Sequence, residues 1–105
     1  MLVVGHHGSL TSSRQAFLNA VGASTFIISS GPHPDSGVTL PDPEIVSELQ
    51  SRGQVFRTDL DDAHCGANTA KIGPDSDESP GGCDNVVVTI STTGALSTAY
   101  NAIVD

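Results

Sequence analysis

The chain has 105 residues, enough for one small domain or part of one. Apolar residues make up 37% of it and aromatic residues 4%, so any core is small. The net charge of −8 argues against a general nucleic-acid-binding surface, because such a surface needs Lys and Arg to neutralise phosphates. No apolar run approaches the ~18 residues of a membrane span, and we expect neither a span nor a signal peptide.

Three short apolar segments in the first 60 residues predict buried strands. The first of them stops at Gly5, and the second is rich in β-branched and aromatic side chains. They comprise residues 1–4, 24–30 and 54–57.

Two segments between these strands predict helices. In residues 12–21, Ser12 is placed to cap the amino end, Gln15 follows at the capping-box spacing, and Gly22 provides a left-handed stop. The expected apolar face of this helix comprises Phe17, Leu18 and Val21.

The second helix follows a loop with four prolines, residues 31–43. Asp42 is the expected cap, Pro43 stands in the first turn, and Gly53 terminates the helix. Its apolar residues, at the same spacing as in the first helix, are Ile45, Val46 and Leu49.

The second half of the chain begins with a long acidic stretch, residues 58–85, that shows no periodicity. Loops of this length are usually functional, cross-linked or disordered. Residues 85–91 predict the clearest strand, and a turn at residues 92–94 predicts a hairpin with residues 96–100. The order β-α-β-α-β, then a loop and a β-hairpin, indicates an α/β fold whose first strands are parallel.

Two adjacent histidines, His6 and His7, are the sharpest chemical feature. They follow a strand and precede a helix, and active sites of layered α/β folds collect at such strand ends. On extended backbone, adjacent side chains point to opposite sides, which predicts different roles. One ring can ligate a metal while the other holds outer contacts or substrate. A pair of exposed loop histidines without such roles is the alternative.

These histidines stand in a segment that resembles a known family. The resembling residues are Val3-Val4-Gly5-His6-His7-Gly8-Ser9, then Thr11-Ser12-Ser13 and Ala16-Phe17-Leu18. A hydrophobic strand, His-His-Gly-Ser, a Thr/Ser-rich cap and a helix follow in this order in the carboxyl-terminal half of metallo-β-lactamase-fold hydrolases. The chain is similar in particular to the hydrolase domain of ComEC-type DNA-uptake competence proteins. The resemblance covers roughly residues 1–60 and the strand at residues 86–90.

The resemblance implies that residues 1–105 are a single partial domain, the carboxyl-terminal half of a metallo-β-lactamase-like αββα sandwich. It implies a metal-dependent hydrolase of phosphodiesters or esters, with zinc or manganese in the complete domain. It assigns metal ligation to His6 and a catalytic, substrate-facing role to His7, and the reverse assignment stays open.

Two departures from the family's pattern affect this expectation. The early His-x-His-x-Asp-His-like motif is absent from this chain, and a tetrahedral zinc site needs three or four protein ligands. Leu40 stands where the family often has a histidine, and His33 and His64 are isolated. We therefore expect an inactive isolated chain whose partner is the missing amino-terminal half or a second copy.

The cysteines form one pair inside the acidic stretch. Cys65 and Cys83 predict a disulfide that closes a loop of about 18 residues and contributes about 3 kcal/mol. Such a bridge favours an extracytoplasmic or secreted location, whereas two reduced thiols fit a cytosolic one.

The same stretch is rich in carboxylates, which with nearby Ser, Asn and Gly can bind calcium. The spacing matches no EF-hand loop, and a solvated run of charges is the plainer interpretation. The carboxylates are Asp59, Asp61, Asp62, Asp75, Asp77, Glu78 and Asp84. The competing function is therefore a non-enzymatic, secreted, disulfide-closed α/β module that binds calcium or a protein partner.

Overall fold

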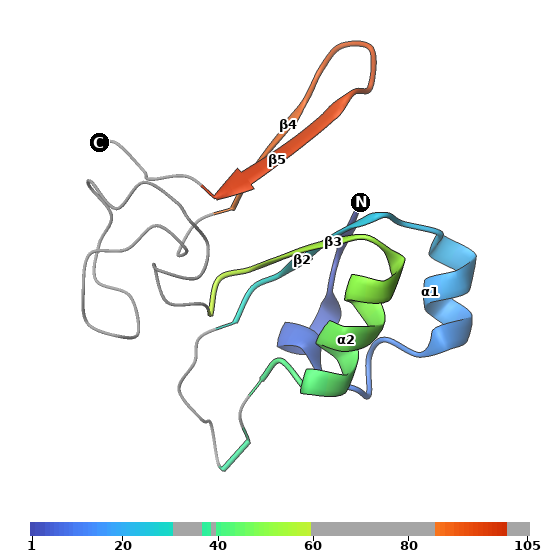
Figure 1. The fold of residues 1–105 in the computed structure, drawn as a ribbon, viewed down its shortest axis with the longest axis vertical. Coiled ribbons are helices and arrows are strands. Elements are labelled where there is room, and N and C mark those ends of the chain that lie inside the picture. Colours follow the sequence, from blue (N-terminus) through green and yellow to red (C-terminus); the bar gives the residue numbers. More distant parts are fainter. Residues whose placement is uncertain (31–36, 39, 60–85, 101–105) are drawn as a thin grey trace, which may run out of the picture. The chain divides into compact units, whose positions relative to one another are not determined.

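The computed structural model describes residues 1–30, 37–38, 40–59 and 86–100. The chain forms two compact units, Met1–Arg57 and Thr58–Asp105. The first contains two helices and a three-stranded sheet, and the second contains a two-stranded hairpin (Figure 1). The protein is therefore a small mixed α/β structure.

The sheet of the first unit is parallel, as predicted. Its strand order is β1-β2-β3, and the register places Leu2, Phe26 and Val55 side by side. The strands are β1 (Leu2–Val3), β2 (Thr25–Ile28) and β3 (Gln54–Arg57). The first two strands are shorter than the apolar runs that predicted them, and β3 has the predicted bounds.

Two helices connect these strands, α1 (Gln15–Val21) and α2 (Pro43–Arg52). Pro43 occupies the first turn of α2, as predicted. At the end of α1, Gly22 adopts φ 62° and donates its N–H to the Leu18 carbonyl at 3.0 Å, which confirms the predicted left-handed stop.

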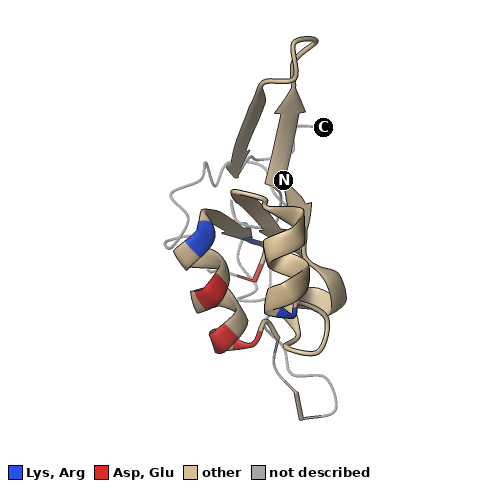
Figure 2. Cartoon of the chain, turned by 90° about the vertical axis from the view of Figure 1, so that its right-hand side faces the viewer, with Lys and Arg blue, Asp and Glu red and all other residues tan. Residues whose placement is uncertain are grey.

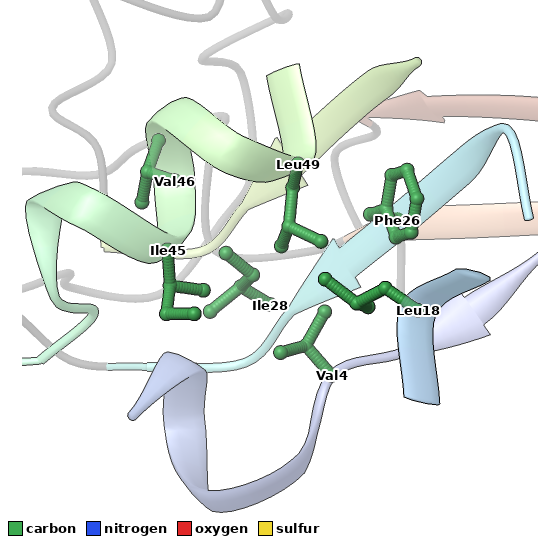
Figure 3. Packing of buried hydrophobic residues seen from close by; sticks show 7 residues of the cluster. All are labelled: Val4, Leu18, Phe26, Ile28, Ile45, Val46 and Leu49. Atoms are coloured by element: carbon green, nitrogen blue, oxygen red, sulfur yellow. The ribbon is translucent and has the colours of Figure 1, made fainter. Parts of the chain in front are cut away.

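One small cluster forms the core of this unit (Figure 3). Phe26 and Ile28 alternate along β2 with less buried residues, and side chains from both helices pack against them. Both helices therefore cover the same face of the sheet, as right-handed crossovers require when strand order follows chain order. The buried cluster comprises Val4, Leu18, Phe26, Ile28, Ile45, Val46 and Leu49.

The prediction of the apolar face of α1 is wrong in part. Leu18 is buried, but Phe17 is 46% exposed and Val21 is 40% exposed. A helix of seven residues presents only two turns to the core, and α1 places one large side chain there. By contrast, all three expected apolar residues of α2 are buried.

The solvent side of α2 carries charged residues (Figure 2). Arg52 forms an ion pair with Glu48 at 2.8 Å, one helical turn away. Gly53 ends the helix in extended backbone, and a Cβ there would overlap the Ser24 carbonyl. The next residue, Gln54, donates its N–H to that carbonyl at 3.0 Å, so the close approach starts β3 beside β2.

The second unit contains the predicted hairpin of β4 (Val86–Ile90) and β5 (Leu96–Tyr100), paired antiparallel. In its turn, Ser91 donates to the Ala95 carbonyl at 2.9 Å, and Gly94 adopts φ 86°. Glycine adopts this left-handed conformation without steric cost, which explains why it occupies this position. Among the described residues, no helix has the length and apolar character needed to cross a membrane.

Candidate functional site

The two histidines lie in a short 3₁₀ segment, Gly5–Gly8, which we call the histidine turn. The turn follows β1 directly, and Val4 continues the ladder by donating its N–H to the Ile27 carbonyl at 2.8 Å. The histidine turn therefore begins at the carboxyl end of β1, as predicted from the sequence.

The backbone of the histidine turn is left-handed, so the expectation of extended backbone is wrong. His6 has φ 48° and ψ 40°, and His7 has φ 53° and ψ 31°. Each left-handed non-glycine residue costs about 1–2 kcal/mol, because Cβ crowds the following carbonyl. Such backbone persists only where its surroundings hold it, and it gathers at functional sites.

Gly8 completes this left-handed run with φ 81° and is buried. A Cβ at this position would overlap the Cβ of Pro41 and come within 3.3 Å of Ile28. Only glycine therefore allows the histidine turn to lie directly against the segment that leads into α2.

The ring of His7 has a defined partner. Its Nδ1 lies 2.6 Å from the backbone carbonyl oxygen of Ser29, the residue after β2. Because a carbonyl only accepts, Nδ1 carries the proton, and Nε2 of the neutral ring is left with its lone pair. His6 is also exposed; its backbone carbonyl accepts a hydrogen bond from the Ser9 N–H at 3.1 Å, and its ring forms none with the other described residues.

Ser12 holds the start of the histidine turn, which corrects its expected role as a helix cap. Its Oγ donates to the carbonyl of Gly5 at 2.9 Å and also lies 3.1 Å from the carbonyl of Ser9. Arg14 occupies the cap position of α1, and its side chain makes no capping bond. The Ser/Thr-rich segment thus stabilises the turn rather than the helix.

Asp42 holds the other side of the histidine turn. Its backbone N–H donates to the Gly8 carbonyl at 2.9 Å, and its Oδ2 accepts from the Leu10 N–H at 2.7 Å. Asp42 does stand at the cap position of α2, as predicted, but its side chain makes no capping bond there. The sequence suggested the helix start and contained no signal for a contact with a residue 32 positions away.

These residues do not form a complete metal site by themselves. Within the described parts of the chain, no group of three or more His, Cys, Asp or Glu side chains could hold a metal ion. The histidine turn offers two imidazoles, and a zinc site needs three or four protein ligands.

Several other candidate residues cannot be placed. Cys65, Cys83, His33 and His64 lie outside the described residues, as do residues 60–85 of the expected disulfide-closed loop at 58–85. So do all of the candidate calcium carboxylates except Asp59, which lies in a turn just after β3. Leu40, which stands in the place of the family's histidine, accepts a hydrogen bond from Ser30 Oγ through its carbonyl at 2.9 Å.

Comparison with protein-family models, with curated proteins and with solved structures found no match to this chain.

Proposed function

We propose that this chain contributes part of the metal site of a metal-dependent hydrolase of the metallo-β-lactamase superfamily, as the carboxyl-terminal half of its αββα sandwich. The hydrogen bond from His7 Nδ1 to the Ser29 carbonyl carries this proposal. This hydrogen bond lies near the carboxyl ends of the parallel strands β1 and β2. It leaves the lone pair of Nε2 available to bind a metal ion. Metal-bound imidazoles are typically oriented by such a bond from their second ring nitrogen.

The contact also bears on which histidine ligates the metal. The resemblance to the family assigns ligation to His6 and the catalytic role to His7. The Ser29 bond favours the reverse, because it fixes the ring of His7 and selects its tautomer. In this assignment His6, which is exposed and whose ring has no hydrogen-bond partner among the described residues, faces the substrate.

The proposal needs ligands beyond the described residues, because two imidazoles do not complete a zinc or manganese site. We assign the remaining ligands to an amino-terminal half of the domain or to a second copy. When bound, the metal would supply a Lewis acid and an activated water for attack on a phosphodiester or ester. The isolated chain is then a weak metal binder without hydrolase activity.

Paramagnetic relaxation by Mn²⁺ tests this proposal on the whole chain. We expect amide signals of residues 5–9 and 28–30 to broaden first as Mn²⁺ is added to the ¹⁵N-labelled protein. His7→Ala abolishes this local broadening, and His6→Ala weakens it less. Mg²⁺ serves as the diamagnetic control, because it separates specific broadening from a general effect of divalent ions.

Three results would overturn the proposal. Absence of broadening around the histidine turn removes the metal site. Broadening confined to residues 58–85 supports instead the competing module that binds calcium through its acidic stretch. An unchanged pattern in His7→Ala would show that the ring does not ligate the ion.

A further inference from the structure

Asp42 departs from the local rule for its position. An aspartate at a helix cap normally accepts a hydrogen bond from an amide in the first turn of its own helix. In α2 the Asp42 side chain makes no such bond, although its carbonyl accepts the Val46 N–H at 3.1 Å and starts the helix. Its Oδ2 accepts instead from Leu10, at 2.7 Å. Residues that form a distant contact instead of the one their local sequence favours are expected at functional or strained sites.

The backbone and the side chain of Asp42 act on two neighbouring points of the same segment. The N–H of Asp42 binds the carbonyl of Gly8, and Oδ2 binds the amide of Leu10, so Ser9 lies between two fixed residues. The bond to Leu10 is charge-assisted, which makes it stronger than a bond between neutral groups. Gly8 also packs against Pro41, so the contact is tight as well as polar.

This contact joins the histidine turn to a rigid element. Helix α2 is anchored in the core by three buried side chains, Ile45, Val46 and Leu49. His7 is adjacent to Gly8, and its left-handed backbone needs support from its surroundings. Ser12 supports the start of the turn from its own side, whereas Asp42 connects the end of the turn to α2.

We propose that Asp42 is a positioning residue for the histidine turn: its carboxylate keeps His7 in the left-handed backbone from which Nδ1 reaches the Ser29 carbonyl. The importance of this role for catalysis rests on the proposed function. The structural effect does not, because the orientation of the His7 ring is observable without any metal.

Three substitutions of Asp42 separate positioning from helix capping. Asp42→Asn keeps an acceptor oxygen within reach of Leu10. Asp42→Ser keeps the ability to cap α2, but its oxygen is one bond closer to the backbone and does not reach Leu10. Asp42→Ala removes both the acceptor for Leu10 and the ability to cap α2. Glu44→Ala is the matched control, because Glu44 is an exposed carboxylate in the first turn of the same helix.

Long-range ¹H–¹⁵N NMR of the full chain at about pH 8, above the ordinary pKa of histidine, reports the tautomer of His7. We expect the Nδ1–H form in the wild type, in Asp42→Asn and in Glu44→Ala. We expect loss of that form in Asp42→Ser and Asp42→Ala, while circular dichroism shows that Asp42→Ser keeps its helices.

Retention of the Nδ1–H form in a folded Asp42→Ser would overturn the proposal. An equal loss of the Nδ1–H form in Glu44→Ala would also overturn it, because the effect would then follow from removing any carboxylate at the start of α2. If Asp42→Ala does not fold, Asp42→Ser and Asp42→Asn still decide the matter. Failure of Mn²⁺ to bind the turn would remove the proposed function and leave this result standing.

Discussion

Gly8 lies against Pro41 so closely that no side chain fits between them. The two residues are far apart in the sequence, and their contact sets the histidine turn beside the start of α2. Because Gly8 also has φ 81°, both its backbone conformation and its surroundings demand glycine.

Replacing Gly8 by alanine should lower the free energy of unfolding by about 3 kcal/mol. A left-handed alanine costs about 1–2 kcal/mol, and overpacking adds about 1–3 kcal/mol. Gly22→Ala is the matched control, since Gly22 has φ 62° but no other atoms near its Cβ position. Its loss should be about 1 kcal/mol. Urea denaturation measures both losses, and equal values would contradict the role of Pro41.

Two neighbouring serines should respond differently to alanine substitution. Ser12→Ala removes an Oγ that binds the carbonyl of Gly5 and should cost about 1 kcal/mol. Ser13 is buried, and its Oγ has no hydrogen-bond partner among the described residues. Ser13→Ala should therefore leave stability unchanged or raise it. Thermal unfolding of both variants tests this order, and a larger loss in Ser13→Ala would contradict it.

β1 is the outer strand of the sheet among the described residues, and it should promote association of the chain with a second copy. Val3 is 61% exposed and lies opposite Ile27 in the sheet register. Exposed apolar residues on an outer strand favour association between sheets. Size-exclusion chromatography with light scattering should show self-association that Val3→Thr reduces. A wild-type monomer with a cooperative transition above ~60 °C would contradict this expectation.

The isolated chain should bind zinc or manganese weakly and hydrolyse no phosphodiester, because the described residues supply too few ligands. Calorimetry measures the affinity, and bis-p-nitrophenyl phosphate is the substrate for the activity assay. Nanomolar affinity, or turnover that His6→Ala or His7→Ala abolishes, would show that the chain holds a complete site.

Cys65 and Cys83 should form a disulfide under oxidising conditions, as expected from their isolation as one pair in a Gly- and Asp-rich stretch. Intact mass before and after alkylation of the non-reduced protein decides this. Two freely alkylated thiols in oxidised material would contradict the pairing and the extracytoplasmic location that it favours.

Features that depend on a few adjacent residues could be predicted from the sequence. Gly22 ends α1, Pro43 begins α2, and Gly94 forms the hairpin turn, because each residue restricts or frees its own backbone. The alternation of short apolar runs with helical segments likewise predicted three parallel strands.

Only the tertiary structure decided how the candidate site is built. Ser12 and Asp42 carry good capping side chains, and local preference assigned both to their own helices. Packing of α2 against the sheet instead brings Asp42 to Leu10, 32 residues away. Ser12 binds the carbonyl of Gly5, seven residues earlier, instead of capping its helix. The left-handed backbone of His6 and His7 has no local sequence signal, and the bond from His7 to Ser29 joins residues 22 positions apart. A side chain with several acceptable hydrogen-bond partners binds the one that the fold places within reach. A local sequence pattern does not specify which distant residues the fold brings close.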